Sequence, residues 1–188
     1  MSLPHAILGL LQWQPMTGYD LKTQQFDKSV NHFWPADQAQ IYRTLDKLVE
    51  QGWASVHLEI QHDRPNRKVY TLTEAGLAEL HRWLSEPQGM PTFRDPFLIQ
   101  VFFADQLTDA QILALLETQR SDHEELLAFY QRMPEYLPLP TLDDKTANRK
   151  QIMHRLVLEM VLFKERAYID WLHQAISTIQ SRSQQSSV

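Results

Sequence analysis

Cationic side chains gather at one short turn of this 188-residue sequence. Arg64, Arg67 and Lys68 lie in or directly after the turn at residues 61–67, between two stretches that alternate in the manner of β-strands. Cations at the tip of a hairpin help no hydrophobic core, whereas they can bind the phosphates of a nucleic acid. A turn that is merely soluble is the alternative. The residue types therefore favour phosphate binding at this turn.

A helix with a hydrogen-bonding face precedes this turn, at residues 37–52. Asp37 is a good N-cap, Gln40 follows at the capping-box spacing, and Gly52 suits the position just after the last turn. Apolar residues recur inside these limits every three to four positions, which predicts one buried face. The opposite face carries glutamine and arginine, which can bind base edges in the major groove, although an ordinary solvated face is the alternative.

Two strands are expected around the basic turn, at residues 53–60 and 68–73. Val56, Leu58 and Ile60 alternate with polar residues, which predicts a strand with one buried face. Thr73 is placed to cap a further helix at residues 74–85. A helix followed by a basic hairpin is the arrangement of a winged helix, in which the helix enters the major groove and the hairpin contacts the adjacent backbone.

The motifs of this region resemble those of the PadR family of bacterial transcription regulators. They are Ala-Ile-Leu-Gly-Leu-Leu at 6–11, Gly-Tyr-Asp-Leu at 18–21, Gln-Ile-Tyr-Arg-Thr-Leu at 40–45, Gly-Trp at 52–53, and Arg-Pro-Asn-Arg-Lys-Val-Tyr-Thr-Leu-Thr-Glu-Ala-Gly at 64–76. The rest of the chain, with Asp-Pro-Phe-Leu at 95–98 and Tyr-Ile-Asp-Trp-Leu at 168–172, is similar to the helical C-terminal domain of longer members.

The resemblance implies a homodimeric, repressor-type regulator that binds a palindromic operator in double-stranded DNA. It also implies that a small-molecule effector releases the DNA, as in many members, and that Tyr19 donates to a phosphate. The family often has glycine or a small polar residue where this chain has Ala39 and Gln40, so the operator sequence cannot be transferred. The candidate DNA-binding residues are Tyr19, Gln38, Gln40, Tyr42, Arg43, Lys47, Arg64, Arg67 and Lys68.

These patterns predict a mainly α fold with a small β-hairpin. The expected segments are a winged helix-turn-helix DNA-binding domain at 1–86, a linker at 87–95, a helical dimerisation domain at 96–180 and a disordered, Ser- and Gln-rich tail at 181–188. Within the first domain, one helix is expected from Leu3 to about residue 12 and a second from Thr17 to about residue 27. Phe33 and Trp34 are expected as core aromatics beneath the helix at 37–52.

The dimerisation domain is expected to contain two long helices. Thr108 and Gln111 form a second capping-box pattern, and Pro134 is expected to end the helix that they open, whose inward side includes Leu126. A last helix, from about residue 145 to 179, carries two apolar stripes. The first stripe comprises Ile152, Leu156, Met160, Phe163, Ala167 and Trp171. The second stripe comprises Leu158, Leu162, Ile169, Leu172, Ile176 and Ile179.

A monomeric surface helix needs only one apolar stripe, so two stripes suggest that one of them packs against a second copy of the chain. The predicted dimer interface is taken from the second stripe: Leu158, Leu162, Ile169, Leu172 and Ile176. Which stripe meets the partner is left open, and burial of the helix inside a single-chain bundle is the alternative. A homodimer would present two recognition helices to successive major grooves about 34 Å apart.

Composition excludes several classes of chemistry. The chain has no cysteine, which excludes disulfides, thiolate nucleophiles and cysteine-ligated zinc. Its eight histidines lack the His-Glu-x-x-His spacing, and neither a glycine-rich phosphate loop nor a nucleophile elbow occurs. We therefore expect no catalytic residue, no metal and no cofactor. Without a long apolar run or the basic start of a signal peptide, a cytoplasmic protein with no membrane contact is expected.

Net charge leaves a second function open. Residues 1–86 contain eight Lys and Arg and ten Asp and Glu, a formal charge of −2, although DNA-binding domains are usually basic. A winged helix that binds protein rather than DNA is therefore the alternative function. Aromatic residues in both domains also suggest an effector site in a cleft between them, with core packing as the alternative. These residues are Trp83, Phe93, Phe97, Phe102, Phe103 and Trp171.

Overall fold

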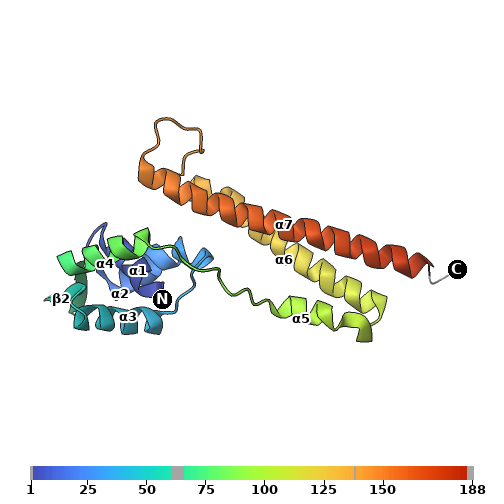
Figure 1. Ribbon diagram of the computed structural model, residues 1–188, viewed down its shortest axis with the longest axis horizontal. Coiled ribbons are helices and arrows are strands. Elements are labelled where there is room, and N and C mark those ends of the chain that lie inside the picture. The colour runs from blue at the N-terminus through green and yellow to red at the C-terminus, as the bar shows by residue number, and fades with distance from the viewer. Residues whose placement is uncertain (1, 61–65, 138, 186–188) are drawn as a thin grey trace. The chain divides into compact units, whose positions relative to one another are not determined.

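The chain is mainly helical with one small antiparallel sheet, which confirms the predicted fold class. The computed structural model describes residues 2–60, 66–137 and 139–185, and the chain divides into two compact units, Met1–Pro91 and Thr92–Val188 (Figure 1). The first unit contains α1 (Leu3–Leu11), β1 (Met16–Thr17), α2 (Gly18–Asp20), the π-helix η1 (Leu21–Phe26), the 3₁₀-helix η2 (Val30–His32), α3 (Gln38–Glu50), β2 (Ala54–Glu59), β3 (Arg67–Leu72) and α4 (Glu74–Ser85). The second contains α5 (Pro96–Phe102), the 3₁₀-helix η3 (Ala104–Gln106), α6 (Asp109–Tyr136) and α7 (Arg149–Gln185).

Helix α3 begins and ends where its capping residues predict. The backbone N–H of Gln40 donates to Asp37 Oδ1 at 2.7 Å, and the backbone N–H of Asp37 donates to Gln40 Oε1 at 2.9 Å, so the capping box is complete. Gly52 has a φ of 72°, a left-handed conformation that glycine adopts without strain. These local signals determine at which residues the helix begins and ends, and burial of its apolar face determines how it packs in the unit.

The core of the first unit lies between α1, α3, α4 and the sheet. Helix α1 packs against both α3 and α4, so it supports the recognition helix from behind. The largest side chains in this core that are fully withdrawn from solvent are Ile7, Leu8, Leu21, Phe26, Ile41, Leu45, Leu48 and Tyr70. Such a core excludes water from a large apolar surface, which is the main stabilising contribution to a unit of this size.

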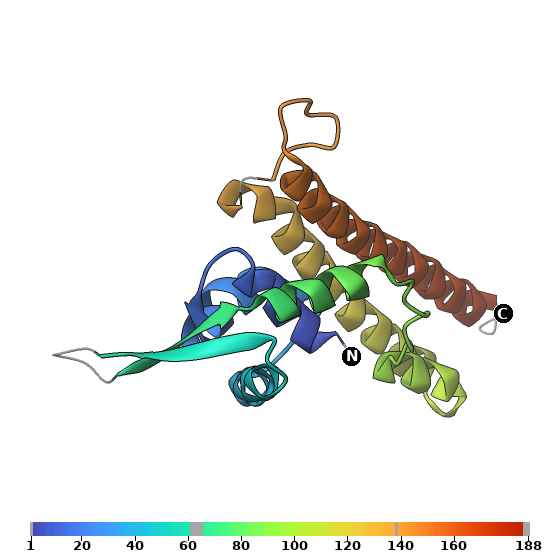
Figure 2. The ribbon, with the colours of Figure 1, turned by 60° about the vertical axis from the view of Figure 1, so that its left-hand side comes forward.

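The sheet has the strand order β1-β3-β2, and both neighbouring pairs are antiparallel. Met16 pairs with Tyr70, Ala54 with Leu72, and the register continues outward along the hairpin. In Figure 2, β2 and β3 extend beyond the helices of their own unit as a long ribbon. The hairpin is therefore a wing that leaves the body of the domain.

The predicted burial of one face of the first hairpin strand is wrong. Val56, Leu58 and Ile60 are all exposed, and Ile60 has an exposed fraction of 73%. Burial does not alternate along β2: Ala54, at its start, is buried, and the next four residues are exposed. Only the base of the wing meets the core. Farther out, the hairpin has no layer beneath it within its own unit.

The expected second helix is present: Thr17 caps it, and it continues to Phe26, one residue before its predicted end. Its second part is the π-helix η1 rather than an α-helix. The wider turn of a π-helix brings Leu21 and Phe26, five residues apart, into the same core. Phe33 and Trp34, expected as core aromatics beneath α3, are exposed, because they follow η2 at the surface.

In the second unit, α6 and α7 are long helices that lie side by side in both views (Figures 1 and 2). The predicted capping box of Thr108 and Gln111 opens α6. Asp95 joins α5 to α7, because its Oδ1 accepts from the backbone N–H of Phe97 at 2.9 Å and its Oδ2 accepts from the Tyr168 hydroxyl at 2.6 Å. Two core clusters follow, one around Leu172 and one around Tyr130.

The ends of both long helices differ from their predicted positions. Helix α6 continues through Pro134 to Tyr136, because one missing N–H does not stop the last turn. Helix α7 starts later than expected and runs to Gln185, so residues 181–185 are helical rather than disordered, while 186–188 lie outside the described residues. Ser183 stabilises this end through a hydrogen bond from its hydroxyl to Asp109.

The residues predicted for the dimer interface lie inside their own unit. The five predicted residues are all buried within their own chain: Leu158, Leu162, Ile169, Leu172 and Ile176. Leu158 and Leu162 pack in the cluster around Tyr130, and Leu172 and Ile176 pack in the cluster with Phe97 and Leu116. A side chain that already fills its own core cannot also present a surface to a partner. On the same helix, Met160 and Phe163 of the first stripe are exposed by 68% and 64%. Leu126 of α6, expected to face inward, is exposed as well.

None of the helices in the described ranges combines the length and the apolar composition that crossing a bilayer requires.

Candidate nucleic-acid interface

Helix α3 turns a continuous polar face to solvent. Gln38, Gln40, Arg43 and Lys47 are exposed, whereas the apolar residues of the same helix are buried in the core of the first unit. Backbone capping at Asp37 holds the N-terminal turn rigid, so these side chains project from a fixed frame. A helix with this face fits the major groove, where arginine and glutamine can bind base edges.

One of these side chains, that of Gln40, also takes part in the capping box of α3. Gln40 uses Oε1 to accept from the backbone N–H of Asp37, so the capping box engages one lone pair of this oxygen and holds its amide in place. A bidentate contact with adenine needs both the carbonyl and the NH₂ group of an amide. Gln40 can therefore donate to a base through Nε2 while it caps the helix, whereas Gln38 has its whole amide available at the surface.

An open groove of about 590 Å³ lies between α3 and the wing. Tyr19 and Tyr42 both line it, Tyr19 well exposed on α2 and Tyr42 half-buried on α3. The groove is lined by Thr17, Tyr19, Asp20, Tyr42, Asp46, Asn66, Arg67, Lys68 and Tyr70. Its hydroxyl and cationic groups suit the contacts that proteins make to phosphate and sugar.

The described part of the wing presents two cations with different surroundings. Arg67 Nε donates to Glu59 Oε2 at 2.8 Å across the hairpin, and the two residues are paired in the strand register. This hydrogen bond from Arg67 lowers the pKa of Glu59, so the carboxylate is ionised at neutral pH. Lys68 is exposed and forms no ion pair within the described residues. Arg64, the third predicted wing cation, lies outside them.

Carboxylates reach the same groove, which explains in part why the unit is not basic overall. Asp46 projects from α3 and raises the pKa of Tyr70, although burial of the tyrosine is the larger cause. Asp20 is held by Thr17 in a capping box and also accepts from Gln24. The sequence analysis did not identify Asp46, Asn66 or Glu59 as site residues. Of these, only Glu59 could have been found from the sequence, because it lies just before a turn that ends in arginine.

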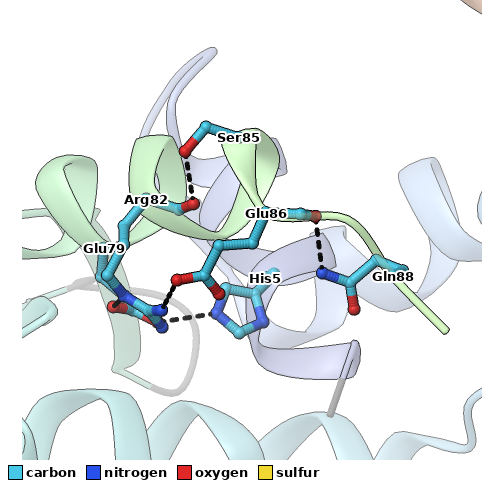
Figure 3. A network of polar contacts seen from close by, with 6 residues as sticks. All are labelled: His5, Glu79, Arg82, Ser85, Glu86 and Gln88. Carbon is cyan, nitrogen blue, oxygen red and sulfur yellow. Dashed lines mark hydrogen bonds and ion pairs between the residues drawn. The ribbon is translucent and has the colours of Figure 1, made fainter.

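A polar network supports the helices behind α3 (Figure 3). Glu79 of α4 accepts from His5 Nε2 of α1 at 2.9 Å and from Arg82 at 2.7 and 2.8 Å. Arg82 also donates to Glu86 at 2.5 Å, and the His5 ring stacks on Trp83 with centroids 4.6 Å apart. These contacts lower the pKa of Glu79 to about 2, chiefly through Arg82 and then through His5. The network joins α4 to the helix on which α3 rests.

Within the described residues, no three His, Asp or Glu side chains lie together in a way that could hold a metal ion. The candidate site consists of exposed hydrogen-bonding and cationic groups on a helix and a neighbouring hairpin. This is the interface of a winged-helix DNA-binding protein.

Comparison with known proteins identifies the family. Residues 7–82 match the transcriptional regulator PadR-like family, and residues 93–180 match the family described as virulence activator alpha C-term. The negative transcriptional regulator PadR of Bacillus subtilis is 33% identical, over 94% of this chain and 97% of its own length. The chain belongs to the PadR-like family of transcriptional regulators, which confirms the resemblance of its motifs.

Two solved structures of Bacillus subtilis PadR show the same fold. The complex of that protein with operator DNA has a TM-score of 0.83 and 32% identity, and the match covers 95% of this chain and 99% of the other. The complex with p-coumaric acid has a TM-score of 0.79 and 31% identity, with coverage of 96% and 99%. Both units of this chain therefore have counterparts in a regulator of known architecture.

Proposed function

We propose that this regulator is a homodimeric repressor that binds a palindromic operator and releases it when a small aromatic acid binds. The observation that carries the proposal is the exposed polar face of α3 beside a projecting basic wing, on a chain that is similar along its length to a regulator solved with operator DNA. The same similarity favours DNA over the alternative of a protein-binding winged helix. We propose no catalytic role, and we place the protein in the cytoplasm because its target is chromosomal DNA.

In this proposal the candidate residues form two groups, one that contacts base edges and one that contacts the phosphate backbone. Gln38, Gln40 and Arg43 read base edges from α3, because only base contacts carry sequence information directly. Backbone phosphates are bound by the remaining candidate residues: Tyr19, Tyr42, Lys47, Arg64, Arg67 and Lys68. These phosphate contacts set affinity and its dependence on salt.

The second unit would bring two copies together, residues 96–180 being the dimerisation domain and 87–95 the linker to the DNA-binding domain at 1–86. The surface that we assign to the partner copy is the exposed apolar stripe of α7: Met153, Leu156, Val157, Met160 and Phe163. An exposed apolar patch of this kind is rare on a monomer and marks a contact surface. A two-fold axis through it would present two copies of α3 to a palindrome.

The test is a fluorescence-anisotropy titration of the DNA upstream of the chain's own gene with the wild-type protein and with Arg67→Ala/Lys68→Ala. The wing variant is expected to bind more weakly by about tenfold, with a shallower dependence of log Kd on log salt concentration. Lys145→Ala/Arg149→Ala removes two exposed cations from the second unit and serves as the matched control. Undiminished binding by the wing variant would remove the wing from the mechanism.

The effector is tested separately, with p-coumaric acid as the probe because Bacillus subtilis PadR was solved with it. A ligand can release DNA only if it binds the free and DNA-bound conformations unequally. We expect the acid to raise the thermal midpoint of the free protein and to lower its affinity for the operator. If neither quantity changes at millimolar acid, this compound is not the effector.

A further inference from the structure

The wing arginine of the DNA interface is already held by a carboxylate of its own hairpin. Glu59 is the last residue of β2 and Arg67 is the first of β3, and the strand register places them directly opposite each other. Arg67 Nε lies 2.8 Å from Glu59 Oε2, and both side chains are about half exposed, at 49% and 44%. The pair therefore lies at the surface of the wing, where a DNA backbone would approach.

Two carboxylates act on the charge of Arg67. The hydrogen bond and the charge of Glu59 raise the pKa of Arg67, and the negative charge of Asp20 acts in the same direction. Lys68, its neighbour in β3, lies opposite Leu58 and forms no ion pair within the described residues. Among the residues that the structure describes, a carboxylate therefore pairs with the arginine but not with the adjacent lysine.

The fold does not need this ion pair. The hairpin strands are already joined by their backbone hydrogen bonds along six residue pairs. An exposed ion pair contributes little to folding, because water screens it and ordering two long side chains costs entropy. Glu59 matters more for any other anion that binds the Arg67 guanidinium, because that anion must compete with the Glu59 carboxylate.

We propose that Glu59 is an intramolecular competitor of the DNA phosphate for Arg67, and so limits the affinity of this regulator for its operator. The inference rests on the proposed function, since it concerns a wing that binds DNA. In the free protein Glu59 holds Arg67, and on binding the guanidinium must leave the carboxylate or share its donors with a phosphate oxygen. Where Arg67 must leave Glu59 to bind a phosphate, the free energy of the ion pair is subtracted from the free energy of binding.

This competition predicts how the removal of the Glu59 charge changes the affinity for the operator and for a scrambled duplex. Replacing Glu59 by the isosteric, uncharged glutamine should tighten operator binding by about 2- to 5-fold, the range expected for an exposed ion pair. The gain on a scrambled duplex should be no larger, because Arg67 binds a phosphate in only some of the non-specific complexes. A carboxylate that merely repelled DNA would give a gain independent of Arg67.

The experiment is a double-mutant cycle on DNA affinity, measured by fluorescence anisotropy with operator and scrambled duplexes. It compares the wild type with Glu59→Gln, Arg67→Ala and the double variant. The gain in affinity from Glu59→Gln is measured once with Arg67 present and once with alanine in its place, and the difference between these two gains is the coupling between the two residues. Glu50→Gln is the matched control: it removes one exposed carboxylate from the last residue of α3, which forms no ion pair within the described residues. Thermal melts of all variants verify that each is folded.

We expect Glu59→Gln to tighten binding more than Glu50→Gln does, and we expect that advantage to disappear in the Arg67→Ala background. Equal gains from the two glutamine variants, or the same gain with and without Arg67, would overturn the role of Glu59 and leave the proposed function standing. A folded wild-type protein that captures neither duplex in dilute salt would overturn both.

Discussion

The ring of Tyr42 lies against the backbone of Gly18, so closely that a methyl group on Gly18 would come within 2.5 Å of Tyr42 Cε1. Gly18 begins α2, the helix that carries Tyr19, and Tyr42 belongs to α3. The absence of a side chain at Gly18 therefore lets the Tyr42 ring pack against α2. Tyr19 and Tyr42 both line the groove beside the wing, so this close approach lies within the candidate DNA site.

Gly18→Ala is expected to weaken operator binding several-fold while costing only about 1 kcal/mol of stability. The added methyl meets the outer part of a tyrosine ring, which can rotate away, rather than rigid backbone. Anisotropy titrations and urea unfolding measure the two effects. In a Tyr42→Ala background the same substitution should change affinity little, and a loss as large as in the wild type would contradict the role of the ring.

Gly76→Ala is expected to be far more damaging to the fold. A methyl there would lie 2.0 Å from the backbone carbonyl oxygen of Trp53, which cannot move without shifting the start of the wing. We expect a loss of about 3 kcal/mol or more in the free energy of unfolding, at the upper end for overpacking. Gly9→Ala is the matched control, since nothing lies within 4 Å of the added methyl and alanine favours a helix. Equal stability of the two variants would contradict the close contact.

The two stripes of α7 are expected to respond in opposite ways to substitution. Phe163→Asp adds a charge to the exposed stripe and should turn a dimer into a folded monomer with weak operator binding. Leu172→Ala opens a cavity beside a fully buried side chain and should cost about 2–5 kcal/mol of stability. Sedimentation and thermal melts separate the two outcomes. A Phe163→Asp protein that stays dimeric would remove this stripe from the interface.

Sequence reasoning succeeded where local chemistry decides the structure. The caps at Asp37 and Thr73 fix the starts of α3 and α4 at the predicted residues. It failed where tertiary packing decides: the periodicity of α7 revealed two apolar stripes, but only the contacts of Leu172 with α5 and α6 show which stripe is internal. The pairing of Glu59 with Arg67 depends on hairpin register, and that register depends on the turn geometry as well as on residue types.

Acid is expected to remove the contribution of Glu79 to folding. The folded pKa of Glu79 is about 2, below the value of about 4.3 for an unfolded glutamate, so its stabilisation is full above about pH 4.5 and is lost as the pH falls toward 2. The difference in thermal midpoint between wild type and Glu79→Gln should therefore shrink as the pH falls from 4.5 toward 2. Glu50→Gln should show no such narrowing, and a difference as large at pH 2.5 as at pH 5 would contradict the mechanism.

Arg43→Ala separates base reading from phosphate binding. Arg43 is exposed in the middle of α3, and its planar guanidinium can bind the O6 and N7 atoms of one guanine. Its removal should cost about 1–3 kcal/mol at one base pair in each operator half-site and relax the preference there. The measurement is a set of affinities for operators that differ from the parent at single base pairs.

The comparison variant for this set is Arg67→Ala/Lys68→Ala, which should weaken every operator by about the same factor, because phosphates are identical in all sequences. With Arg43→Ala, by contrast, one operator position should lose its discrimination while the others keep theirs. If Arg43→Ala weakened all operators equally, its guanidinium would be binding backbone, and base reading by α3 would depend on Gln38 and on the free NH₂ group of Gln40.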